Sequence, residues 1–296
     1  MDILTLDRAQ GYLMHGAFGE LVADKYFPPD MTLRPLTPEE WSWLPDETDP
    51  DYYSPYWGDL VQELEGLYRC YIHVPDDPAN MVFRFLPATM EPPGKGAGAL
   101  AIAGALAPIF PAWSELRSEV EQVIESFSSA SQDLEAALEW AYWVHSVIYG
   151  ESEPDSALDE ASTELNPSEL DDLQVTSAAQ AAQVASWYAL CALRNEISYA
   201  EALNRAILCH GAPMELGFLT GACMGLSLMT NDDPLPVWGL DLVPQYIEDI
   251  EGTDNDYYDT GLLLRLIPKA MIAREYAHQS VPGRLFTSLQ KGGEHS

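Results

Sequence analysis

Apolar residues recur at three- and four-residue steps through much of the chain, which is the spacing of helices that bury one face. The pattern is clearest in residues 131–150, where Ser131 suits an N-cap and Gly150 suits a C-terminal stop. The repeating positions between them are Leu134, Leu138, Ala141, His145 and Ile148. This segment therefore predicts a half-buried helix.

Similar patterns predict further helices, and no segment keeps the alternation of a strand. Ser198, followed three residues later by Glu201, forms a capping-box pattern at the start of one of them. The expected helices cover residues 6–23, 57–71, 98–108, 114–127, 131–150, 176–194, 198–208 and 262–276. The fold class expected is all-α, a single compact multi-helix bundle over residues 1–296.

Two stretches interrupt this pattern with closely spaced prolines, residues 27–55 and 73–97. Proline every few residues prevents long regular elements, so both are expected to be irregular excursions on the surface. Residues 151–172 are acidic and of low complexity, which is typical of a solvated loop between helices.

The charge balance restricts the partners of the chain. The chain contains 14 lysines and arginines but 47 aspartates and glutamates, which gives a formal charge of −33. Such a surface repels phosphate backbones and anionic lipid, which argues against binding nucleic acid or docking on membranes. A protein partner with a basic surface would be attracted. The alternative is that the acidity serves only solubility or suits a saline cytoplasm.

Cysteine usage and hydropathy indicate a cytoplasmic protein without a membrane span. The four cysteines show no CxxC spacing, so reduced thiols are expected. The most apolar run, residues 98–113, is shorter than the ~20 residues of a spanning helix, and the start of the chain does not resemble a signal peptide.

Glycines at helical spacing mark two of the segments. Gly11, Gly16 and Gly19 stand in the first expected helix, where each costs ~1 kcal/mol relative to alanine. They indicate that another backbone or a ligand approaches closely there. In "HGAPMELGFLTGACMGL", which starts at His210, the glycines at 217, 221 and 225 repeat every four residues.

Three segments in order resemble the ADP-ribosylglycohydrolases of the dinitrogenase reductase-activating glycohydrolase type. "DRAQGYLMHGAFGELVAD" is similar to the first motif, with Glu20 at its aspartate position, although His15 and Ala23 replace two glycines. "YWGDLVQELEGLYRC" matches the second motif at Trp57 and Asp59. "HGAPMELGFLTGACMGL", with "LDLVP" behind it, resembles the third, and the matching positions are Gly211, Gly221 and Gly225. The resemblance covers about residues 7–244.

The resemblance implies an all-α fold in which two magnesium ions help to cleave ADP-ribose from a modified residue. Ala212 and Met214, however, fall where the family has two aspartates, and Leu60 removes another oxygen. Magnesium requires oxygen ligands in near-octahedral geometry, and a thioether is too soft to replace them. The weak remaining candidates for metal ligands are Asp59, Glu20 and Glu215.

The leading functional expectation is a catalytically inactive, regulatory protein that binds a protein partner with a basic surface. No catalytic residue, metal or cofactor is assigned to it. An ADP-ribose-like molecule is the candidate ligand of a vestigial cleft formed by Gly19, Glu20, Asp59, His210, Gly211 and Glu215. The candidate partner-binding residues are the aromatics Trp41, Trp43, Tyr52, Tyr53 and Tyr56. By family analogy, an immunity role against an ADP-ribosyltransferase is one subclass.

Two alternatives stay open. The first is an active hydrolase that removes ADP-ribose from a modified protein, with a rearranged magnesium site built from Glu20, Asp59 and Glu215. The second is a structural subunit of a larger assembly, with residues 27–55 ordered against another chain. Structural roles also remain open for single residues: Asp59 at a helix dipole, His210 as a helix cap, and His15 and His145 as core histidines.

Overall fold

The computed structural model describes residues 3–26, 97–127, 131–150, 173–209 and 211–228, together with residues 152–154, 158, 170 and 270–271. Within these ranges the chain is helical and contains no strand. Its elements are α1 (Ile3–Tyr26), α4 (Ala97–Leu106), the 3-10 helix η2 (Ala107–Ile109), α5 (Trp113–Phe127), α6 (Ser131–Ile148), α8 (Ala178–Leu193), α9 (Tyr199–Leu208) and α10 (Pro213–Leu228). The all-α prediction is confirmed for this part of the chain.

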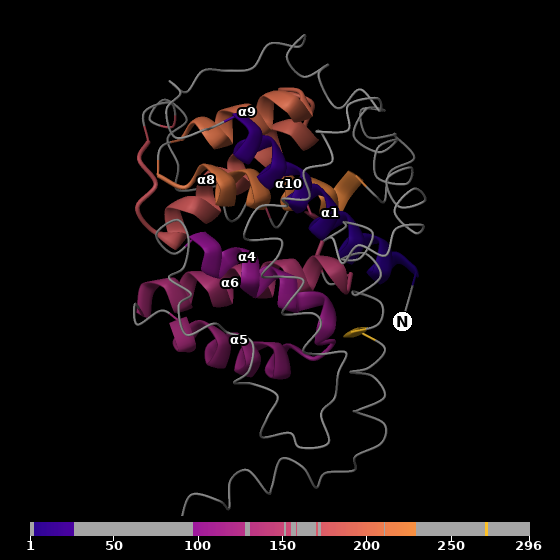
Figure 1. Ribbon diagram of the computed structural model, residues 1–296. Helices are drawn as coiled ribbons and strands as arrows, with labels where there is room; N and C mark the ends of the chain where they lie inside the picture. Colours follow the sequence, from indigo (N-terminus) through magenta and orange to yellow (C-terminus); the bar gives the residue numbers. More distant parts are fainter. Residues whose placement is uncertain are drawn as a thin grey trace, which may run out of the picture.

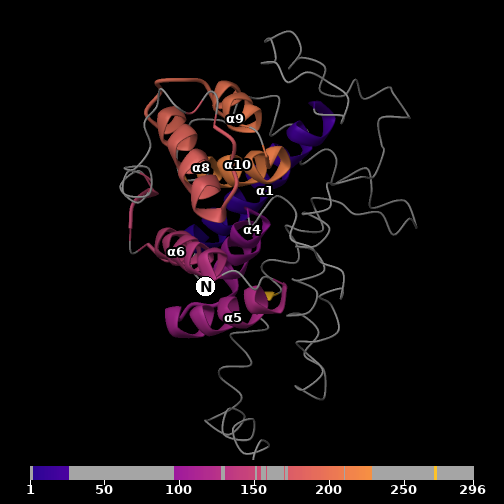
Figure 2. The ribbon, with the colours of Figure 1, turned by 90° about the vertical axis from the view of Figure 1, so that its left-hand side faces the viewer.

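The helices form two groups that meet along α4 (Figure 1). In both views α8, α9 and α10 lie in one half and α5 and α6 in the other, whereas α1 slants from the first half down toward α6 (Figures 1 and 2). Every residue of α4 is buried, because it packs against α6 on one side and against α8 and α10 on the other. Segments far apart in the sequence, α1 and α10, are thereby brought side by side at the centre of the upper half.

The backbones of α1 and α10 touch along a row of glycines. A Cβ atom added at Gly217, Gly221 or Gly225 would overlap a carbonyl oxygen of α1. Those oxygens belong in turn to Gly19, His15 and Gly11, so the two helices run antiparallel with matching four-residue steps. The sequence-based expectation of a close backbone approach is confirmed, and the approaching backbone is α10.

Tyr12 connects four helices at the centre of the core. It is completely buried on α1, and its hydroxyl accepts a hydrogen bond from Trp140 Nε1 of α6 at 3.0 Å. Its ring meets Phe218 of α10 edge-on, with 6.2 Å between centroids. Gly104 of α4 leaves the space for the hydroxyl, since a Cβ atom there would overlap it. The polar end of Tyr12 therefore has its hydrogen bond in the core.

The C-terminal end of α6 is held by Gly150 and by a buried arginine from α1. Gly150 has a φ of +76° and donates its N–H to the Val147 carbonyl at 3.1 Å, which confirms it as the stop of this helix. Arg8 donates from Nη1 to the same carbonyl. A cation at this position also interacts favourably with the negative end of the helix dipole.

Helices α8 and α9 begin at serine caps. Ser177 Oγ accepts from the Gln180 N–H and Ser198 Oγ accepts from the Glu201 N–H. The predicted N-cap at Ser198 is therefore confirmed. The carboxylate of Glu201 pairs along α9 with Arg205 at 2.6 Å.

Most predicted helix limits agree with the structure within a few residues. The first helix starts at Ile3, three residues before its predicted limit. The excursions at 27–55 and 73–97, the helix at 57–71 and nearly all of 151–172 and 262–276 lie outside the described residues. No helix among those described combines the length and apolar character needed to cross a bilayer.

Adding one methyl group at the α1–α10 contact should destabilise the fold. We expect Gly221→Ala to lower the free energy of unfolding by about 3 kcal/mol or more, because the new Cβ meets backbone that cannot move away. Gly16→Ala is the matched control on the same interface. There the Cβ would meet only the Phe218 ring, at 2.7 Å, and we expect a loss of about 1 kcal/mol. Urea denaturation followed by circular dichroism measures both, and a Gly221→Ala protein as stable as the wild type would contradict the packing described.

Candidate functional site

The region expected to form a cleft is the end of the α1–α10 pair at the N-terminus of α10. Gly211 precedes this helix with a φ of +115°, and a Cβ atom on it would overlap the Val175 carbonyl oxygen. Both its conformation and its surroundings therefore require glycine. The turn that matches the family's third motif is thus present in the fold.

The residues after this turn carry no hard metal ligand at the two positions where the resemblance implies aspartates. Ala212 is buried and occupies the N-cap position, since its carbonyl accepts from Leu216 N at 2.9 Å. Its methyl side chain can neither cap the helix nor bind a cation. Met214 is 38% exposed and offers only a thioether.

Two carboxylates do lie at this end of the helix pair, and both are buried. Glu20 follows Gly19 on α1 and is 1% exposed, whereas Glu215 precedes Gly217 on α10 and is 4% exposed. Because Gly19 and Gly217 contact each other, both glutamates stand within one helical turn of that contact. The structure therefore brings together four predicted site residues, Gly19, Glu20, Gly211 and Glu215, at the same end of the pair.

Burial changes the acidity of Glu215. Removal from water raises the pKa of its carboxyl above the usual range, and a hydrogen bond from its own backbone N–H opposes this in part. A carboxyl with this tendency takes up a proton more readily than an exposed one, so a proton competes more strongly with a cation for it.

A pair formed by the buried His15 and the partly buried Tyr199 lies further along the same interface. His15 Nδ1 and Tyr199 Oη are 3.0 Å apart, and their rings meet edge-on with 5.6 Å between centroids. Burial lowers the pKa of His15 to about 4 and raises that of Tyr199. His15 is therefore neutral at physiological pH, and Nε2 forms no hydrogen bond within the described structure. The expected core role of His15 fits this environment.

The sequence did not indicate this pair, because its members are 184 positions apart. Gly225 of α10 lies beside the histidine, since a Cβ atom there would come within 2.8 Å of the Cβ of His15. His145, the other expected core histidine, is also buried and bonds through Nε2 to the Pro111 carbonyl at 3.2 Å.

Several predicted site residues are outside the described part of the chain. They include Asp59 and His210 of the vestigial cleft. The aromatic partner-binding set is outside it as well, Trp41, Trp43, Tyr52, Tyr53 and Tyr56. Within the described ranges, histidine, cysteine, aspartate and glutamate form no group of three or more that could hold a metal ion. The described donors at this site, Glu20 and Glu215, therefore do not fit a two-magnesium centre.

Comparisons with protein-family models, with curated proteins and with solved structures give no match for this chain. The resemblance to the ADP-ribosylglycohydrolases thus rests on the residues quoted from the sequence. Of those residues, Gly11, Gly19, Gly221 and Gly225 form the α1–α10 contact, and Gly211 forms the turn before α10.

The buried histidine should make stability depend on pH. The unfolded chain binds a proton near the ordinary histidine pKa of about 6.5, whereas the fold resists protonation of His15 down to about pH 4. Neutral His15 thus contributes fully to the free energy of unfolding above pH 6.5, and this contribution is lost as the pH falls toward 4. We expect a loss of about 3 kcal/mol across this window relative to His15→Gln, which lacks the titrating group. Denaturant titrations of both proteins from pH 7 to 4 measure the difference. Parallel curves would contradict the assigned environment.

Replacing Glu215 by its neutral isostere tests the second buried group. Its raised pKa means that ionisation costs stability in the fold, so the cost appears as the pH rises above the ordinary carboxyl range. We expect Glu215→Gln to be more stable than the wild type at pH 8, with the gain shrinking toward pH 5. Glu201→Gln is the matched control, because Glu201 is also the third residue of its helix but is only partly buried and pairs with Arg205. We expect Glu201→Gln to lower the free energy of unfolding by about 0.3–0.5 kcal/mol, because it removes the ion pair with Arg205. Thermal melts at several pH values distinguish the two, and a Glu215→Gln protein that is less stable at pH 8 would contradict the burial argument.

Proposed function

We propose that this chain is a non-catalytic binding protein built on an ADP-ribosylglycohydrolase-like helical framework. The observation that carries the proposal is the turn at Gly211 and Ala212. The glycine is required by the backbone there, but the next residue places a buried methyl group where the related enzymes hold a metal ligand. A framework that keeps the turn while its ligands are replaced supports binding more than hydrolysis.

The charge of the chain supports a protein partner with a basic surface. A formal charge of −33 attracts a cationic partner and accelerates its approach over roughly a Debye length, about 8 Å at physiological salt. An ADP-ribose-like molecule is a second candidate ligand, which the family resemblance alone suggests. The proposed setting is the cytoplasm, where such a regulatory protein would meet its partner.

One observation favours the alternative of an active hydrolase. Glu20 and Glu215 are both buried at the same end of the α1–α10 pair, as a rearranged site would require. Hydrolysis would still need an activated water and stabilisation of the charge that develops at the anomeric carbon. The described residues supply two carboxylates for that work, and the third member of this proposed site, Asp59, lies outside them.

Magnesium titration with turnover of ADP-ribosyl-arginine separates the two functions. We expect no release of ADP-ribose above the background at any magnesium concentration, and no magnesium-dependent change in melting temperature. A working glycohydrolase of this type, assayed in parallel, serves as the positive control. Saturable, magnesium-dependent release that is abolished by Glu20→Gln and by Glu215→Gln would overturn the proposal in favour of the enzyme.

Affinity capture at increasing salt tests the binding half of the proposal. We expect a basic protein to be retained at low salt and lost gradually as salt rises, which is the behaviour of electrostatic docking. An unrelated acidic protein of similar net charge is the control for diffuse attraction. Equal capture by both proteins would contradict a specific partner.

A further inference from the structure

The outer face of α6 combines exposed carboxylates with an exposed aromatic ring. Glu135, Glu139 and Tyr142 are all exposed and follow each other at steps of four and three residues, so they form one row along the helix. Tyr142 is 50% exposed, which is unusual for a large side chain in this structure. We call these three residues the α6 row.

No cation compensates the α6 row from its own helix. The sequence of α6 contains neither lysine nor arginine, and in the described structure Glu135 and Glu139 form no ion pair. Two glutamates four residues apart on a helix repel each other and destabilise it by a few tenths of a kcal/mol. A positive charge placed between them would remove that repulsion.

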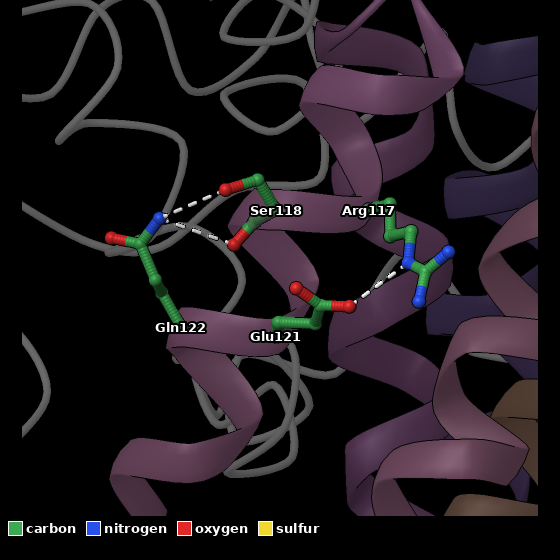
Figure 3. A network of polar contacts seen from close by, with 4 residues as sticks. All are labelled: Arg117, Ser118, Glu121 and Gln122. Atoms are coloured by element: carbon green, nitrogen blue, oxygen red, sulfur yellow. Dashed lines mark hydrogen bonds and ion pairs between the residues drawn. The ribbon is translucent and has the colours of Figure 1, made fainter. Parts of the chain in front are cut away.

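The neighbouring helix α5 differs in this respect (Figure 3). Arg117 pairs with Glu121 at 2.9 Å, and Gln122 donates from Nε2 to the carbonyl and to the hydroxyl of Ser118. These groups satisfy each other within the helix, which is typical of a solvated face. Helix α5 therefore has one arginine that pairs with a glutamate of its own helix, whereas Glu135 and Glu139 have no lysine or arginine on theirs.

The aromatic member of the row is held in place by packing. The Tyr142 ring meets Trp113 of α5 edge-on, with 4.9 Å between centroids and 71° between planes. Trp113 also packs against His145, which in turn bonds to the Pro111 carbonyl. A ring fixed at its base and exposed at its other side can receive a cation without first becoming ordered.

We propose that the α6 row is a docking site for an arginine-bearing, extended segment of a protein partner. One guanidinium would lie on the Tyr142 ring and pair with Glu139, and a second would pair with Glu135. Arginine fits better than lysine, because its planar group stacks on aromatic rings and binds carboxylates bidentately. The inference rests on the proposed binding function and assigns that function to one face.

The spacing of the row suggests the spacing of the arginines. Seven helical residues separate Glu135 from Tyr142, which corresponds to about 10 Å at 1.5 Å per residue. An extended segment in the polyproline II conformation rises about 9 Å over three residues and completes one turn, so every third side chain lies on the same face. Arginines at every third position of such a partner segment would therefore match the row.

Peptide binding to the full chain tests the assignment. The probe is a nine-residue peptide of three Arg-Ser-Gly repeats, compared with the same peptide carrying lysine or glutamine. We expect the arginine peptide to bind most tightly at low salt. Glu139→Lys should weaken it about tenfold, whereas Glu196→Lys should change it less than twofold. Glu196 is exposed in the turn between α8 and α9 and its substitution changes the net charge equally. Fluorescence anisotropy gives the affinities, and melting curves check that each variant folds.

Tyr142→Ser provides the second measurement, because it leaves the net charge unchanged. We expect this substitution to lower the affinity for the arginine peptide about fivefold and the affinity for the lysine peptide by less. The preference for arginine over lysine should therefore become much smaller. If the charge variants at 139 and 196 weaken binding equally, or if Tyr142→Ser keeps the arginine preference intact, the docking site is wrong.

The experiment also separates this inference from the proposed function. Equal effects at 139 and 196 would leave a basic partner held by the surface as a whole, so the proposed function would stand without this site. If affinity capture retains no basic protein and none of the peptides binds, the proposed function fails as well.

Discussion

The backbone contact between α1 and α10 determines the position of nearly everything else in the described structure. Three glycines of α10 lie against carbonyl oxygens of α1, so neither helix can move away or rotate without opening the core. Each glycine costs about 1 kcal/mol of helix propensity, and the close approach of two backbones offsets this through dispersion and weak Cα–H···O contacts. The contact fixes Tyr12 against Phe218 and Trp140, and the hydroxyl of Tyr12 in turn requires Gly104 in α4.

The same contact gives the glycine pattern a structural cause that does not depend on catalysis. Packing requires glycine at these positions of both helices, and the backbone conformation requires it at Gly211, whether or not a ligand binds. Side chains next to them, such as Ala212 and Met214, have no comparable packing requirement for an acidic group. A sequence can therefore keep the glycine pattern of an enzyme for structural reasons while its metal ligands change. The pattern by itself is evidence of a helix pair, and function depends on the residues between the glycines.

Hydrophobic periodicity and capping residues predicted α1, α4, α5, α6, α8 and α9, whereas only the four-residue spacing of its glycines indicated α10. Ser198 and Gly150 form the cap and the stop expected from them, and the glycines at 11, 16 and 19 indicated a close approach. The identity of the approaching element could not be read from the sequence, because local spacing carries no information about a partner 200 positions away. For the same reason the His15–Tyr199 pair and the Arg8 contact with Val147 were not expected. Of the candidate site, the glutamates at 20 and 215 could be named in advance, but their burial depends on which helices cover them.

Among the described carboxylates, the buried ones at the α1–α10 contact differ in their consequences from the exposed Glu135 and Glu139 of α6. Those at the α1–α10 end are buried, and at Glu215 burial favours the protonated form, which weakens the case for a cation there. Those on α6 are exposed, remain in water and repel each other along one helix. A cationic partner gains little from the buried carboxylates, since reaching them would require opening the core. The same partner can pair directly with the exposed Glu135 and Glu139. The half-exposed Tyr142 ring beside them adds an apolar contact to these ion pairs. Binding by this chain is therefore expected at its outer helices and hydrolysis, if any, at the glycine contact, so the two functions can be tested independently.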